Sequence, residues 1–342
     1  MINLSLQKIT EKERKIVMKK NIYGIDVGNY DTKSANTCVS SAYTTSKTQP
    51  IWESEYLFYN GSYYIPSFSR PAIVKDKTSV IANDRALILT LMSIGKETLS
   101  RLAKNNITEH DEIQSKINEI DEIYLGTGLP PRYMSKEKAE KEKEYYMSKM
   151  GNGIDFMYND FEFHITLKDI SVFPQGLLPT LFYATDKVTM YNNYYGIDIG
   201  GYTVDVVFVS NGTTDFEKTI TLELGVLPLY ENIIQKVLME YDLSLDHLLI
   251  DNVLQGKPHI LDDEVVATIN SCTNDWVISI INELQQKKIN LKTYPSCWSG
   301  GGSLLFKPYI EKSDLIAKQH EYIKDVRANA KSYQKMIQST LG

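Results

Sequence analysis

The sequence predicts an α/β protein of about two domains, and three observations lead to that prediction. The chain has 342 residues, a length that suggests two domains. Short apolar runs rich in β-branched residues alternate with longer segments of helical periodicity. One strand–turn–strand motif, Gly-Ile-Asp-(Ile/Val)-Gly, occurs twice, at 24–28 and 196–200, so that its two aspartates lie 172 residues apart (198 − 26).

The second copy of the motif, at 195–209, is the stretch around which the chain is organised. Its first strand is apolar except for Asp198, and Gly200 and Gly201 leave room for a phosphate to approach the turn. A buried aspartate is unfavourable unless it meets a cation or hydrogen-bond donors. Two such hairpins facing each other would cradle a polyphosphate and hold Mg²⁺ through Asp26 and Asp198. Two unrelated hairpins with glycine turns are the plainer interpretation.

Apolar periodicity and turn residues predict the remaining elements. Strands are expected at 21–27, 32–40, 51–59, 63–65, 121–127, 154–158, 161–167, 168–173, 195–199, 204–209, 214–222 and 290–298. Helices are expected at 84–104, 135–150, 178–186, 226–241, 243–254 and 262–288, and a last one starts in the tail after 326. Ser135 suits an N-cap, and the charged helix that follows it is either a solvated face or a filament contact.

Three further features are candidates for binding or catalysis. Lys33 follows the first glycine turn, where it could reach a phosphate as a point charge. Gln175 comes after a strand and before a helix, where an amide can orient a water molecule. Gly300, Gly301 and Gly302 follow a strand and would let the backbone approach a flat ligand closely; the alternative is a flexible linker.

Composition narrows the class of protein. The net charge is −6, which makes broad direct binding to nucleic acid unexpected. The three cysteines are far apart and fit buried thiols in a reducing, cytoplasmic compartment better than disulfides. The five histidines show no metal-ligand spacing, and no apolar run approaches a membrane span. The first 17 residues are expected to be an appendage without a secretion signal.

The order of these elements resembles that of the actin-like ATPase superfamily, over about residues 21–339. Within it the chain is most similar to ParM and related bacterial actin-like proteins. The shared stretches are Ile-Asp-Ile-Gly-Gly-Tyr-Thr-Val-Asp at 197–205, Gly-Thr-Gly-Leu-Pro at 126–130, Leu-Gly-Val at 224–226, Val-Phe-Pro-Gln-Gly at 172–176 and Ala-Asn-Ala-Lys-Ser-Tyr at 328–333. Gln175 departs from several ParM proteins, which carry glutamate there, whereas actin carries glutamine.

The resemblance implies an α/β, actin-like ATPase fold with two α/β domains flanking a nucleotide cleft. Domain I would span 18–185 and be rejoined by the tail at 315–342, and domain II would span 186–314. Asp26 and Asp198 would hold Mg²⁺ through waters and help position the attacking water, which Gln175 would orient. Lys33 would neutralise developing charge, and Gly300, Gly301 and Gly302 would flank the adenosine. The phosphates of ATP or ADP would be held by Gly28, Asn29, Tyr30, Gly200, Gly201, Tyr202 and Thr203.

The resemblance also implies partners. Subunits would bind ATP and polymerise head to tail, and a ParR-like DNA-binding adaptor would link the filament to plasmid or phage DNA, so that centromere DNA is reached indirectly. Such contacts are heterologous and open-ended, as a filament requires.

Three other functions are compatible with the sequence. A small-molecule kinase of the superfamily would need a base for a substrate hydroxyl, for which Asp205 is the one tempting residue. A chaperone-like ATPase would carry a long substrate domain after the glycine run. A non-polymerising relative would act as a regulator or scaffold.

Overall fold

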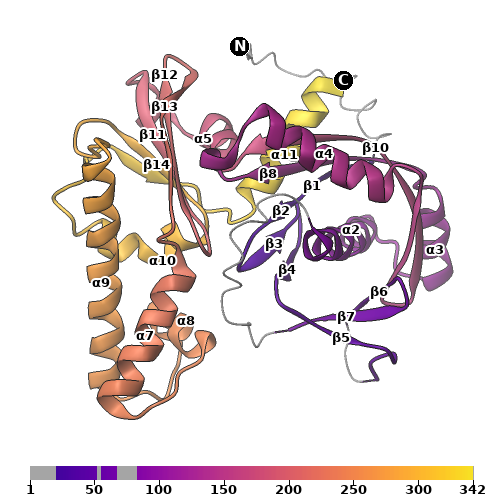
Figure 1. The fold of residues 1–342 in the computed structure, drawn as a ribbon, viewed down its shortest axis with the longest axis horizontal. Coiled ribbons are helices and arrows are strands. Elements are labelled where there is room, and N and C mark those ends of the chain that lie inside the picture. Colours follow the sequence, from indigo (N-terminus) through magenta and orange to yellow (C-terminus); the bar gives the residue numbers. More distant parts are fainter. Residues whose placement is uncertain (1–20, 52–54, 68–82, 342) are drawn as a thin grey trace.

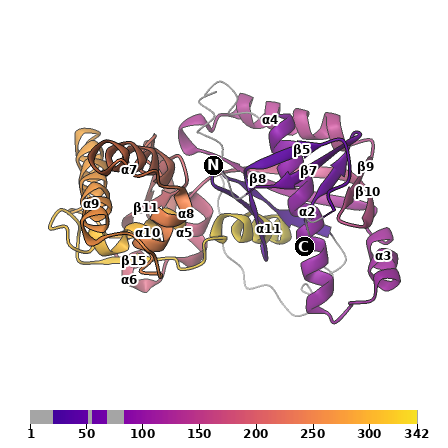
Figure 2. The same ribbon diagram turned by 90° about the horizontal axis from the view of Figure 1, so that it is seen from below.

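The computed structural model describes residues 21–51, 55–67 and 83–341, which form two lobes (Figure 1). The expected appendage at 1–17 lies outside the described residues. Each lobe contains a sheet with its own buried apolar cluster. The view from below shows the last helix, α11 (Ala328–Leu341), lying between the lobes (Figure 2). None of the helices in the described ranges has the length and apolar character needed to cross a bilayer.

The first lobe is built on a seven-stranded sheet with the order β1-β8-β10-β9-β6-β7-β5. Its strands are β1 (Asn21–Gly24), β5 (Tyr43–Ser46), β6 (Leu57–Tyr59), β7 (Ser62–Pro66), β8 (Glu122–Leu129), β9 (Ile154–Tyr158) and β10 (Phe161–Pro174). Strands β1, β8 and β10 run parallel, so their carboxyl ends meet at one edge of the sheet. The smaller sheet β2 (Asp26–Val27), β3 (Asp31–Lys33) and β4 (Cys38–Ser40) begins at that edge.

The second lobe is built on a five-stranded sheet with the order β13-β12-β11-β14-β15. Its strands are β11 (Asn193–Ile199), β12 (Val204–Ser210), β13 (Thr213–Leu222), β14 (Ser296–Ser299) and β15 (His320–Tyr322). The central strand β11 is buried from Tyr194 to Ile199, which explains its near-continuous apolar sequence. Because β15 pairs with β14, residues 320–322 lie on the second sheet, and the chain returns to the first lobe with α11.

Ten helices and one 3₁₀ turn are present among the described residues. They are α2 (Asp84–Lys104), α3 (His110–Asn118), η1 (Pro131–Tyr133), α4 (Lys136–Met150), α5 (Leu177–Tyr183), α6 (Asp186–Thr189), α7 (Val226–Tyr241), α8 (His247–Leu254), α9 (Asp263–Gln286), α10 (Gly301–Ile310) and α11. The predicted bounds of α2 and α7 are confirmed, and the Ser135 side chain caps α4 by accepting from the backbone N–H of Lys138 at 3.2 Å.

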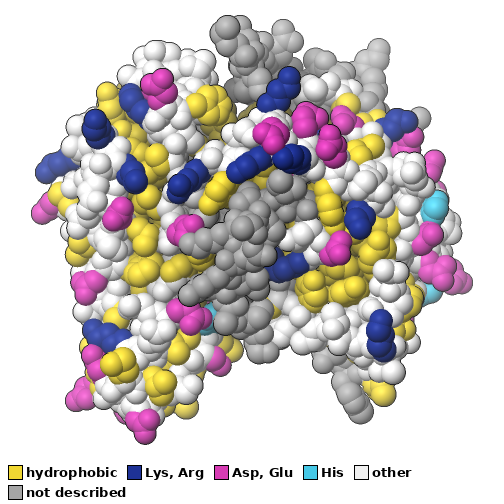
Figure 3. Space-filling view, in the orientation of Figure 1, with side chains coloured by type: hydrophobic (Ala, Val, Ile, Leu, Met, Phe, Trp, Pro, Cys, Tyr) yellow, Lys and Arg dark blue, Asp and Glu magenta, His cyan; other side chains and the backbone are white. Residues whose placement is uncertain are grey.

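The charged helix α4 presents interleaved basic and acidic side chains to solvent (Figure 3). Several of these charges pair along the helix, as Lys141 does with Glu137 at 2.6 Å and Lys143 with Glu140 at 3.8 Å. The spacing of these pairs is that of neighbouring turns, which favours the reading of a solvated helix face.

Several predicted boundaries were wrong. The helix predicted at 243–254 begins only at His247, after the Asp246 cap. The strand predicted at 51–59 is only β6 among the described residues, and the strand predicted at 21–27 is divided between two sheets. The strands predicted at 161–167 and 168–173 are one strand, β10, because a bulge between Leu167 and Asp169 shifts the alternation without ending the pairing. The strand predicted at 32–40 is divided by a turn closed by the Ser34 N–H and the Thr37 carbonyl. The helix predicted at 178–186 is divided because Ala184 is extended and Thr185 caps α6. The strand predicted at 290–298 is only β14.

Helix α11 packs tightly against β1 and β8 at the carboxyl-end edge of the first sheet. A Cβ atom on Gly24 would lie 2.0 Å from the carbonyl oxygen of Ala330, closer than any real contact. Glycine at this position therefore permits the approach of strand and helix.

We expect Gly24→Ala to lower the free energy of unfolding by about 1–3 kcal/mol, because the added methyl group must displace helix backbone. The matched control is Gly301→Ala, where a Cβ would meet nothing within 4 Å and helix propensity favours alanine by up to about 1 kcal/mol. Urea unfolding of both variants checks this, and equal shifts would contradict the packing argument.

Candidate functional site

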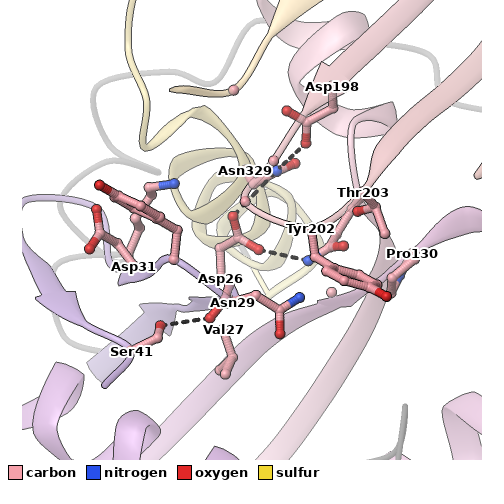
Figure 4. A pocket seen from close by; sticks show the side chains of 18 of the residues that line it. Asp26, Val27, Asn29, Asp31, Ser41, Pro130, Asp198, Tyr202, Thr203 and Asn329 are labelled. Carbon is pink, nitrogen blue, oxygen red and sulfur yellow. Dashed lines mark hydrogen bonds between the residues drawn. The ribbon is translucent and has the colours of Figure 1, made fainter. Parts of the chain in front are cut away.

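A cavity of about 310 Å³ lies between the two copies of the hairpin motif (Figure 4). This volume is within the range of small-molecule sites. Both turns line it, together with the carboxyl ends of β8 and β10 and the start of α11. The predicted site residues that line it are Asp26, Gly28, Asn29, Tyr30, Lys33, Gln175, Asp198, Gly200, Gly201, Tyr202, Thr203 and Gly300.

The two turns touch across the cavity. A Cβ atom on Gly201 would lie 2.7 Å from the Cβ atom of Tyr30, so the second turn needs glycine where the first turn approaches it. Within each turn one glycine N–H is already bonded: Gly28 donates to the Asp26 carbonyl at 3.0 Å, and Gly200 to the Thr203 carbonyl at 2.8 Å. These two amides stabilise the turns. Only the other residues of each turn can therefore donate backbone hydrogen bonds to a ligand.

The second turn is docked on the start of α7. The backbone N–H of Val226 donates to the Gly200 carbonyl at 3.2 Å, and that of Leu227 donates to the Gly201 carbonyl at 2.7 Å. The Gly225 N–H donates to the Tyr202 carbonyl at 2.9 Å. The first amides of α7 therefore bond to the turn, and the turn is held in one position by a helix of the second lobe.

Asp26 and Asp198 come together on one amide group. The Nδ2 atom of Asn329, on α11, donates to Asp198 Oδ2 at 2.7 Å and lies 3.4 Å from Asp26 Oδ2 (Figure 4). The Oδ1 atom of Asn329 accepts from the backbone N–H of Gly176 at 3.0 Å. One side chain thus connects the strands β2 and β11 with the turn after β10.

Gln175 lies in that turn and faces the same carboxylates. Its Nε2 atom donates to Asp26 Oδ1 at 2.9 Å, and its backbone N–H donates to the Leu129 carbonyl at 2.9 Å. The next residue, Gly176, has a φ of +74°, and a Cβ there would lie 2.9 Å from Asp198. The left-handed turn at Gly176 therefore directs Gln175 into the cavity.

Burial and the like charge of Asp26 raise the pKa of Asp198 above its usual value. The Asn329 amide and the Lys33 ammonium act in the opposite direction and favour the carboxylate. Two buried carboxylates with few compensating charges repel each other, and their ionised forms are unfavourable without a partner. A bound cation would offset their repulsion.

The donor set fits a magnesium ion. Hard carboxylate oxygens suit Mg²⁺, which takes one or two carboxylates together with waters and phosphate oxygens. Within the described ranges no group of three or more His, Cys, Asp or Glu could hold a metal, so a magnesium ion bound by Asp26 and Asp198 would need waters or a bound ligand to complete its coordination.

The three consecutive glycines have different surroundings. Gly300 has a φ of +85°, and a Cβ there would lie 2.4 Å from Asp198 Oδ1, so it backs onto the carboxylate. Gly301 and Gly302 are the first residues of α10. Gly301 faces open space and Gly302 packs against Ile199 and Val226.

Asp205 is a further buried carboxyl group beside the site. Thr221 Oγ1 donates to its Oδ1 atom at 2.6 Å, and Thr203 Oγ1 donates to its Oδ2 atom at 3.0 Å. Burial raises the pKa of Asp205 to about 8, although the Thr221 hydroxyl counteracts this. A carboxyl group that is protonated near neutral pH and bonded to two hydroxyls is a poor general base.

Sequence reasoning assigned no role to Asn329, although the stretch 328–333 contributed to the resemblance. The sequence feature that could have indicated its role is its place at the start of a helix inside that shared stretch. Its partners lie 303 and 131 residues away in the chain, so no local pattern could identify them.

We expect Asp205→Asn to change how stability depends on pH. The pKa of Asp205 is raised in the folded chain, so between about pH 4, the unfolded value, and about pH 8 the unfolded chain releases the proton and the folded chain keeps it. The wild type should therefore lose stability relative to Asp205→Asn as pH rises through this window, with a constant difference above it. Urea unfolding at pH 5, 6, 7 and 8 checks this, and parallel curves would contradict it.

No family model and no curated protein sequence matches the chain. Solved structures do match. An archaeal actin homolog in complex with ADP is 16% identical with a TM-score of 0.68, over 93% of this chain and 99% of that one. A 15-stranded ParM filament from Clostridium botulinum is 15% identical with a TM-score of 0.67, over 93% and 98%. The actin-like protein Alp7A is 12% identical with a TM-score of 0.67, over 94% and 96%. The predicted class is confirmed: this chain has the actin-like fold.

Proposed function

We propose that the chain binds and hydrolyses ATP with Mg²⁺ in the cavity between its two lobes. The observation that carries the proposal is the convergence of Asp26, Asp198 and Gln175, from three separate elements, on one cavity between two glycine turns. The ADP complex of the archaeal actin homolog supports a nucleotide as the ligand.

Each residue has a role that follows from its position. Asn29, Tyr30, Tyr202 and Thr203 line the cavity and would bind the phosphates through their backbone amides, with Lys33 as a nearby cation. When bound, Mg²⁺ supplies charge neutralisation for the phosphate oxygens. Gln175, fixed by Asp26, orients a water molecule for in-line attack, and Asp198 takes part in positioning that water. Gly300 lines the cavity and would flank the adenosine.

We further propose that subunits assemble head to tail into nucleotide-dependent filaments. Two of the similar structures are described as filaments of ParM and of Alp12. Large apolar side chains are exposed at the end of α7, at the start of α8 and in the segment before α9, with Met239 86% and Ile260 94% exposed. Exposed apolar side chains that gather in one patch are typical of protein contacts. A repeated heterologous contact produces an open polymer.

The role in the cell that fits best is segregation of plasmid or phage DNA in the cytoplasm, through a ParR-like adaptor that binds the centromere. The net charge of −6 fits an indirect route to DNA. A small-molecule kinase is less well supported, because Asp205 is bonded to two threonine hydroxyls and its raised pKa favours the protonated form.

ATP turnover and light scattering, with ATP, with ADP and without nucleotide, test the proposal together. We expect ATP-dependent scattering and pelletable filaments from the wild type, and a fall in turnover by orders of magnitude in Asp198→Ala with the fold retained by circular dichroism. Asp314→Ala, at an exposed carboxylate, is the control. Normal turnover in Asp198→Ala would overturn the site. A flat scattering trace with ATP bound would favour the non-polymerising reading.

We expect Gln175→Ala to hydrolyse ATP at least about tenfold more slowly and to form longer-lived filaments, because the water loses its orienting amide. Phosphate release and the decay of scattering after ATP is exhausted measure the two effects. The exposed Gln286→Ala serves as the matched control. Unchanged phosphate release would remove Gln175 from the mechanism.

A further inference from the structure

Tyr30 crosses from the first lobe to the second at the cavity. It belongs to the turn of the first hairpin, yet its hydroxyl donates to Asp251 Oδ2, on α8 of the second lobe, at 2.5 Å. The two residues are 221 positions apart in the chain. A hydrogen bond to a carboxylate is charge-assisted and about twice as strong as a neutral one. The contact therefore links the lobes directly beside the proposed phosphate site.

The second lobe holds Asp251 in place for this contact. The hydroxyl of Tyr230, on α7, donates to Asp251 Oδ1 at 2.5 Å, and Gln255 Nε2 lies 3.4 Å from the same oxygen. Tyr230 is fully buried, and its ring meets that of Tyr30 edge-on with centroids 6.5 Å apart. One carboxylate is thus shared by two phenols, of which one is anchored in the core of the second lobe.

The site itself constrains the position of Tyr30. Its Cβ atom faces Gly201 of the second turn, and its carbonyl accepts from the Ser41 N–H at 3.2 Å. Separating the lobes would break the Tyr30–Asp251 bond and release the first turn from the second. The position of the first turn is therefore coupled to the position of α8.

We propose that Asp251 is a positioning residue that acts through Tyr30: it holds the first turn against the second lobe and keeps the cavity closed over its ligand. The proposal rests on the proposed function, since the ligand is taken to be a nucleotide. Tyr230 orients Asp251, and the three side chains together form a clamp across the cavity. The consequence is a longer residence time for bound nucleotide.

The test compares Tyr30→Phe and Asp251→Asn with Tyr241→Phe. The control removes a hydroxyl that bonds to Thr268 Oγ1 at 2.8 Å within the second lobe and does not cross the cavity. Fluorescent N-methylanthraniloyl-ATP is bound and chased with excess ATP in a stopped-flow instrument. We expect dissociation to accelerate about tenfold or more in Tyr30→Phe, a few-fold in Asp251→Asn, whose amide is a weaker acceptor, and not at all in Tyr241→Phe.

A second measurement needs no nucleotide. Hydrogen exchange of the free protein should be faster at the turn amides 28–31 and in α8 for Tyr30→Phe and Asp251→Asn, but not for Tyr241→Phe. If nucleotide binds and leaves at the wild-type rate in both clamp variants, the proposal is overturned. If the wild type binds no nucleotide, the proposed function fails, and unchanged exchange at 28–31 then overturns the clamp as well.

Discussion

The structure depends on one shared amide group between two buried carboxylates. Asp26 and Asp198 come from different lobes, carry like charges and are shielded from water, so their proximity is unfavourable unless donors lie between them. Asn329 supplies the donor, and its carbonyl in turn accepts from Gly176. Asn329 therefore fixes the relative positions of β2, β11, the turn before α5 and the start of α11.

Close backbone approach is the second constraint, and glycine makes it possible at a few positions. Gly24 lets α11 lie against β1, and Gly201 lets the two turns meet. The aspartates of the repeated motif carry like charges that favour a bound cation. The glycines in the motif and next to it let the surrounding backbone enclose the place where that cation would lie. The same short sequence thus determines both the charge of the candidate site and the packing around it.

Much of the fold could be predicted from local sequence. Apolar periodicity predicted α2 and α7, and the Ser135 cap predicted the start of α4. The repeated motif predicted two facing turns. The bulge in β10 could not be predicted, because it depends on pairing with β8. In the site, the residues of the two turns were recognisable from their pattern, whereas Asn329 and Asp251 act through partners more than a hundred residues away. Contacts between residues so far apart produce no periodic pattern in the sequence.

The position of α11 has a consequence for biosynthesis. A ribosome makes the polypeptide from its amino end, so both aspartates emerge well before the asparagine that joins them. Until α11 docks beside β1, the nascent chain lacks the Asn329 side chain that bonds to both aspartates, and the cavity is incomplete. The cavity is therefore complete only after translation has passed residue 329 and α11 has docked.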